Sequence, residues 1–209
     1  MCSHQHHDHD SHVCEAHEED ALNFGRLSLN SMIDHAKLVT YNESVEGSGA
    51  KVFRADKNGT DRDAFVTSDA DEELLFIVPF SGRTKVTGIA VGSQADSSSP
   101  AKIRLFANKP NMTFDDCRLQ PDQELELQKD PKGDLFHSMK ATKFGALTHL
   151  VIHVAENFGS DSTRINYIEL RGEKIGEIKD QVVIAVYESR ALKKDHKNIV
   201  PDGVKHDIM

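Results

Sequence analysis

The sequence predicts an all-β fold: an antiparallel β-sandwich of the jelly-roll type with about nine strands. Short apolar or alternating segments recur between turn residues along most of the 209-residue chain. Almost no segment shows the 3.6-residue period of an amphipathic helix. The hydrophobic content of 38% is sufficient for the core of one large all-β domain.

The most apolar part of the chain lies between residues 68 and 92. Its segment LLFIVPF, residues 74–80, has no polar position, so both faces of this strand should be covered. Ser81 and Gly82 then favour a tight turn, and the β-branched segment TKVTGIAV indicates a second strand. Pro79 should lie near the end of the first strand, because it has no backbone N–H to donate. The prediction is therefore a central pair of strands.

The segments before this pair predict little regular structure. We expect a short helix or turn within residues 21–38, a strand at 37–41, and a long connection over 42–65. Val52 and Phe53 are the apolar residues that should fix this connection to the core.

Alternation predicts the later strands KIRLFA, ELEL, THLVIHV, RINYIEL and QVVIAVYES. Successive side chains of a strand point to opposite faces, so THLVIHV should divide between an inner and an outer face. The expected sets are Leu150, Ile152 and Val154 on one face, and His149, Val151 and His153 on the other.

The two ends of the chain differ in composition from the middle. Residues 1–20 contain six histidines and six carboxylates but no lysine or arginine, which predicts a disordered His-rich acidic tail. Residues 21–189 should form the sandwich, and residues 190–209 a flexible C-terminal tail.

Composition narrows the classes of partner and the compartment. A formal net charge of −9 argues against nucleic acid, which needs a basic face. The sequence shows neither a long apolar span nor a secretory signal, so we expect no membrane association and a location in the cytoplasm and nucleus. Cys2, Cys14 and Cys117 are odd in number and irregularly spaced, which favours reduced thiols. A monomer is expected.

Motif analysis gives no catalytic signature. The chain has no GxSxG elbow, no phosphate-binding glycine loop and no CxxC pair, so we expect a protein that is not an enzyme and needs no cofactor. His149 and His153 share a strand face, but their Cα atoms should lie about 13 Å apart, too far to ligate one ion. They are interpreted as structural histidines.

The N-terminal tail is a candidate metal-binding segment, because neutral imidazole and thiolate are ligands for Zn²⁺, Ni²⁺ and Cu²⁺. The spacing matches no single zinc-finger pattern, so a solvated tail that merely attracts metal is the alternative. The candidate ligands are His4, His6, His7, His9, His12, Cys14 and His17.

An acidic segment precedes the central apolar strand and has three interpretations. It is a solvated charge run that protects the strand, a cation site, or a patch for a protein partner. The DxDxDG spacing that calcium favours is absent. With the loop at 42–49, this segment supplies the candidate partner-binding residues Asp69, Asp71, Glu72, Glu73, Asn42 and Glu43.

Several longer segments together resemble the PITH domain family. They are YNESVEGSG at 41–49, SDADEELLFIVPFSG at 68–82, RLFANKPNMTFDD at 104–116, PDQELEL at 121–127 and KFGALTHLVIHVAENFGSDSTRINYIELRGE at 143–173. The chain resembles a stand-alone copy of this domain, which is related to the C-terminal, proteasome-interacting domain of a thioredoxin-like protein.

The resemblance implies a jelly-roll sandwich, binding to the 26S proteasome through its regulatory particle, no cofactor, and a cytosolic and nuclear location. Thioredoxin chemistry is not implied, because the chain has no CxxC. Two other classes of function stay open on the sequence. One is a small-ligand or carbohydrate-binding jelly roll, although no tryptophan is present for sugar stacking, and the other is metal handling by the His-rich tail.

Overall fold

A computed structural model describes residues 27–58 and 63–177, and the predicted tails and the predicted strand QVVIAVYES lie outside these residues. None of the helices within the two ranges is long and apolar enough to cross a membrane. The elements are β1 (Leu27–Ser28), η1 (Asn30–Met32), β2 (Val39–Tyr41), α2 (Ser48–Lys51), β3 (Val66–Thr67), β4 (Leu74–Gly92), β5 (Pro100–Ala107), η2 (Asp116–Arg118), β6 (Gln123–Glu126), β7 (His137–Ser138), α3 (Ala141–Phe144), β8 (Leu147–Asn157), β9 (Arg164–Ile165) and β10 (Tyr167–Gly176).

The central apolar stretch is one strand, so the predicted turn at Ser81 and Gly82 is wrong. β4 runs for 19 residues through both positions, with an irregular register against β8 between Pro79 and Thr84. Gly82 is needed for close approach instead of a turn, because a Cβ there would lie 2.9 Å from the carbonyl oxygen of Gly176. Pro79 lies where regular pairing with β8 stops, which suits a residue without an N–H.

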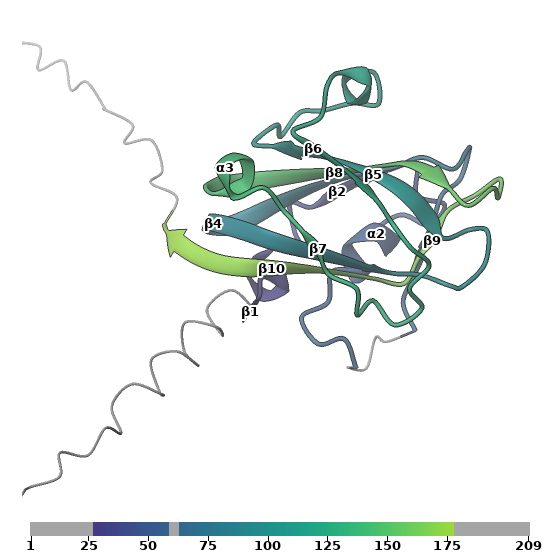
Figure 1. Ribbon diagram of the computed structural model, residues 1–209, viewed down its shortest axis with the longest axis horizontal. Helices are drawn as coiled ribbons and strands as arrows, with labels where there is room; N and C mark the ends of the chain where they lie inside the picture. The colour runs from purple at the N-terminus through teal and green to yellow at the C-terminus, as the bar shows by residue number, and fades with distance from the viewer. Residues whose placement is uncertain (1–26, 59–62, 178–209) are drawn as a thin grey trace, which may run out of the picture. The chain divides into compact units, whose positions relative to one another are not determined.

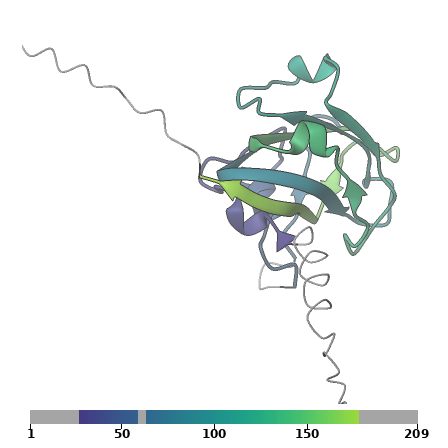
Figure 2. The same ribbon diagram turned by 60° about the vertical axis from the view of Figure 1, so that its left-hand side comes forward.

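The length of β4 lets it belong to both layers of the sandwich (Figure 1). Its first half pairs with β2 on one side and β8 on the other, and the layer continues through β5 to β6. Its second half pairs with β10 and β7, and β1 extends that layer beyond β10. Figure 2 shows β10 and β4 side by side. All these pairings are antiparallel, which confirms the predicted jelly-roll sandwich with a similar number of strands.

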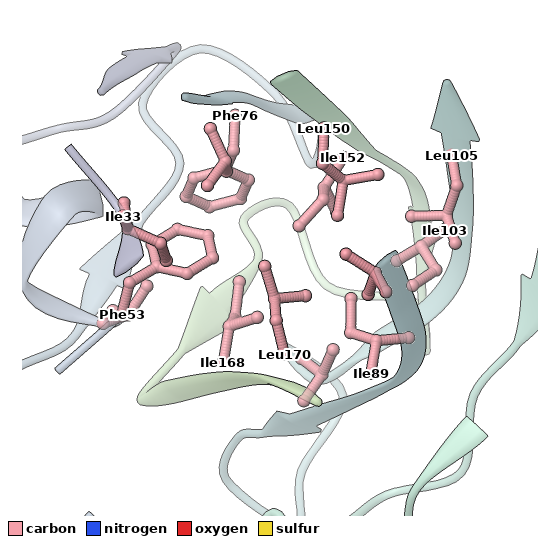
Figure 3. Close-up of a cluster of buried hydrophobic side chains, with 14 of the residues drawn as sticks. Ile33, Phe53, Phe76, Ile89, Ile103, Leu105, Leu150, Ile152, Ile168 and Leu170 are labelled. Carbon is pink, nitrogen blue, oxygen red and sulfur yellow. The ribbon is translucent and has the colours of Figure 1, made fainter. Parts of the chain in front are cut away.

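The main core lies between the two layers (Figure 3). Both halves of β4 contribute, through Phe76 and Ile89, and the inner face of β8 supplies Ile152. The predicted anchors Val52 and Phe53 are fully buried, and the rings of Phe53 and Phe76 meet edge to face with centroids 5.7 Å apart. The connection over 42–65 is therefore fixed to the core, as its sequence predicts.

A smaller apolar cluster covers the outer face of the layer that contains β8. The outer-face residues of β4, β5 and β8 alternate with the core residues, which confirms the predicted division of THLVIHV. The segment between β5 and β6, which carries η2, folds back over this face and adds Met112, Phe114 and Cys117. This layer is therefore apolar on both faces.

Candidate functional site

A pocket of about 520 Å³ lies at the edge of this outer cluster. Five segments line it: the end of β2, the acidic loop 68–73, β5, the η2 segment and β8. It combines aromatic, acidic and basic side chains with one buried histidine. These lining groups include Tyr41, Asp71, Glu73, Arg104, Phe114 and His153.

His153 forms the buried polar part of the pocket. Its side chain is 3% exposed, and its ring meets Phe114 edge to face at 6.0 Å between centroids. Its Nε2 lies 2.7 Å from a carboxylate oxygen of Glu73. An ionised carboxylate can only accept, so Nε2 carries the ring proton and donates a hydrogen bond to Glu73, which leaves Nδ1 as an acceptor. Nδ1 has no hydrogen-bond partner among the residues that the structure describes.

Burial lowers the pKa of His153, because the charged imidazolium loses its hydration, and this effect outweighs the opposing hydrogen bond with Glu73. Burial also lowers the pKa of His149 on the same strand. The interpretation of His153 as a structural histidine was therefore incomplete, since its ring joins the acidic loop to β8 and faces a pocket.

The lowered histidine pKa predicts that stability falls with acid. Between the ordinary pKa near 6.5 and the lower folded value, the unfolded chain binds more protons than the folded chain, so the free energy of unfolding should decrease as pH falls below about 6.5. Urea unfolding between neutral and mildly acidic pH measures this. His153→Gln keeps a donor for Glu73 but does not titrate, so its stability should depend less on pH than that of the wild type. Equal pH dependence in both proteins would contradict the role of His153.

Cys117 lines the pocket but is not a reactive thiol. Its side chain is buried, and its Sγ is 3.3 Å from the carbonyl oxygen of Thr113. Burial, with the nearby carboxylates of Glu73 and Asp116, raises its pKa to about 11. At neutral pH the thiol is protonated and therefore a weak nucleophile.

Asn42 holds the acidic loop in place. It has a left-handed backbone conformation with φ of 65°, which asparagine tolerates better than most residues. Its amide nitrogen donates to Asp71 Oδ1 at 2.8 Å and to the Glu73 carbonyl at 2.7 Å, and its amide oxygen accepts from the Ala70 N–H at 2.9 Å. The loop at 42–49 and the acidic loop, predicted separately as binding surfaces, are thus one connected unit.

Glu43 is used within its own loop. Its carboxylate accepts from the N–H groups of Gly47 and Gly49, both at 2.6 Å, and from the Ser48 hydroxyl at 3.2 Å. Its contribution is to shape the loop at 42–49 and α2, so little of its carboxylate is left for a partner.

The four predicted acidic residues have different surroundings. Asp69 and Asp71 are exposed, whereas Glu72 and Glu73 are half-buried. Asp71 and Glu73 line the pocket, and Asp69 and Glu72 do not. The structure therefore separates the acidic segment into two pocket residues and two neighbouring residues of equal charge.

Several residues of the site were not among those predicted. His153 lies on the outer face that the alternation predicts, and Arg104 lies between the core residues of β5. Their proximity depends on the pairing of β5 with β8. Phe114, Cys117 and Arg118 lie between β5 and β6, in a segment for which the sequence predicts no strand. No local pattern could have shown that this segment folds back over the sheet.

The predicted metal ligands of the N-terminal tail lie outside the described residues. Within residues 27–58 and 63–177, no three His, Cys, Asp or Glu side chains gather closely enough to hold a metal ion. The cation-site interpretation of the acidic segment has no support from this geometry.

The fold places the chain among β-sandwich domains found in other proteins. One solved structure with a similar fold is a family 89 glycoside hydrolase from Clostridium perfringens, with a TM-score of 0.51 and 17% identity. The similarity covers 75% of this chain and 16% of the hydrolase. Identity this low shows a shared fold only.

Sequence comparison gives the family. The PITH domain profile matches residues 19–191, so the chain belongs to the PITH domain family. PITH domain-containing protein ZK353.9 of Caenorhabditis elegans is 47% identical over 207 residues, which cover 98% of each chain. PITH domain-containing protein 1 of Homo sapiens is 43% identical over 183 residues, or 88% of this chain and 85% of the human protein. The predicted family resemblance is confirmed.

Proposed function

We propose that this chain is a non-enzymatic protein-interaction module that docks on the regulatory particle of the 26S proteasome or on a related protein complex, in the cytoplasm and nucleus. Membership in the PITH domain family supports the general role in protein interaction. The contact surface consists of the pocket side of the acidic loop, with Asp71 and Glu73, and the adjoining end of β2. We call this surface the acidic face.

The single observation that carries this proposal is that the acidic face is exposed and yet anchored to the end of β2 by hydrogen bonds. Asn42 links three positions of the loop to β2, so binding would cost little loss of backbone freedom. On β2, whose end lines the same pocket, Val39 and Tyr41 are 40% and 43% exposed. Apolar and aromatic side chains next to charge are common at protein interfaces.

The chemistry of the pocket favours binding over catalysis. The pocket contains a protonated thiol and a histidine that donates to a carboxylate, and its described residues provide no hydrogen-bonded pair of nucleophile and base. These features support the proposal that the chain acts by contact with a partner.

Capture of purified 26S proteasome by the immobilised full chain at moderate salt tests the proposal. We expect capture by the full chain, and comparison with a chain lacking residues 190–209 shows whether the C-terminal tail contributes. An unrelated protein of similar size and net charge serves as the control, since charge alone can retain a large complex. No capture by either form, or equal capture by the control, would contradict docking on the proteasome.

A further inference from the structure

We propose that the pocket of the acidic face receives an arginine side chain of the protein partner. This inference rests on the proposed function and deepens it, because it states which chemistry of the partner the acidic face recognises. Four features of the pocket support it: its charge balance, its unused acceptors, its aromatic lining and its size.

Among the described residues, no lysine or arginine is paired with either carboxylate of the pocket. Asp71 accepts from the amide of Asn42 and from the Glu73 N–H, and Glu73 accepts from His153; all of these donors are neutral. No salt bridge joins Asp71 or Glu73 to a lysine or arginine among the described residues. Both carboxylates therefore keep their negative charge available to a ligand.

The two arginines that line the pocket already face carboxylates of their own. Arg104 Nε donates to Glu124 at 2.9 Å, and an Arg118 guanidinium nitrogen lies 3.9 Å from Asp115. The Arg118 side chain is 85% exposed, so solvent screens its charge. The pocket together with these partners carries an excess of negative charge, which favours a cation over an anion.

The hydrogen-bonding groups of the pocket also require donors. One oxygen of Asp71 and one of Glu73 accept no hydrogen bond from the described residues. Among side chains, the guanidinium of arginine brings five N–H donors and no acceptor. It can bond two carboxylates at once, with a geometry that the ammonium of lysine does not provide.

The aromatic lining favours arginine as well. Tyr41 is partly exposed at the rim, and Phe114 lies inside against His153. A planar guanidinium stacks on aromatic faces, and its apolar stem can pack against them. The volume of about 520 Å³ is sufficient for one large side chain with its backbone outside.

The test uses a short capped peptide with one arginine, and the same peptide with citrulline in its place, titrated into the ¹⁵N-labelled full chain. Citrulline has nearly the same shape but no charge. We expect the arginine peptide to shift the NMR signals of residues around Tyr41, Asp71 and His153, and to bind about tenfold more tightly than the citrulline peptide. Asp71→Asn and Glu73→Gln should each weaken the arginine peptide by about fivefold to tenfold.

Asp69→Asn is the matched control, because it removes the same charge from the same loop outside the pocket. It should change the affinity by less than about twofold. Equal binding of both peptides, an equal loss in Asp69→Asn and Asp71→Asn, or no shift at these residues would overturn the arginine pocket. Inorganic phosphate that shifts the same signals more than the arginine peptide would overturn it too.

The two proposals can fail separately. Arginine binding without capture of the proteasome would keep the pocket but refute that partner. Capture that Asp71→Asn and Glu73→Gln leave unchanged would keep the docking function but refute the pocket as its contact.

Discussion

Phe76→Ala should lower the free energy of unfolding by about 3 to 5 kcal/mol, the largest loss that we expect from one core substitution. Phe76 is fully buried in the first half of β4, between β2 and β8. Its edge-to-face contact with Phe53 is lost with the ring. Because paired strands lie on both sides, the backbone cannot move to fill the cavity, and the full cost should be observed.

Equilibrium unfolding in urea measures this loss, with Phe158→Ala as the control. The same atoms are removed from Phe158, but its side chain is 41% exposed, and the expected cost is about 1 kcal/mol or less. A loss below about 1 kcal/mol for Phe76→Ala would mean that β4 is not the centre of the core.

Asn30→Ala should cost about 3 kcal/mol or more, although it removes only a small polar group. Asn30 is fully buried in η1, where its amide nitrogen donates to the carbonyls of Arg54 and Ile168 at 2.9 and 2.7 Å. Its amide oxygen accepts from the Leu170 N–H at 3.1 Å. The substitution leaves two buried backbone groups, the Ile168 carbonyl and the Leu170 N–H, and the partly buried Arg54 carbonyl without this partner. Each unsatisfied buried group costs about 1 to 3 kcal/mol.

Unfolding of Asn30→Ala is compared with that of Asn111→Ala, an exposed asparagine with no side-chain hydrogen bond to the described residues. We expect less than about 0.5 kcal/mol from the control. Similar stabilities for the two variants would contradict this role of the Asn30 amide. They would show that it does not hold η1 and the connection over 42–65 against β10.

The sequence predicted the architecture because the inner residues of the strands follow a simple pattern. The unbroken apolar run at 74–80 indicated a strand that is covered on both faces, and both faces are buried. The alternation along THLVIHV correctly separated Ile152 from His153. Such patterns reflect whether each side chain is buried, and burial of one position can be inferred without knowing which strands pair.

The predicted turn at Ser81 and Gly82 shows where sequence patterns fail. Glycine after an apolar run is typical of a turn, but here it allows the backbone of β4 to approach Gly176. Only the tertiary structure distinguishes these two uses of glycine. The pattern therefore predicts two strands, where a single strand, β4, passes between the two layers.

The candidate site was predictable in its acidic part and not in the rest. A run of carboxylates before an apolar strand is visible in the sequence, but the roles of its members are not. Asn42 and Glu43 prove to position the loops, while His153 and Arg104, from strands far along the chain, complete the pocket. Convergence of this kind depends on sheet register, which no local pattern specifies.

The affinity of the full chain for purified 26S proteasome, measured at low and at moderate salt, tests the central claim most directly. The wild type is compared with a variant that carries Asp71→Asn and Glu73→Gln together, and with Asp69→Asn. If the acidic face docks through its pocket, the double variant should bind about tenfold more weakly, with a smaller dependence on salt, and Asp69→Asn should stay close to the wild type. Equal affinity and equal salt dependence in all three proteins would contradict the claim that this face is the contact.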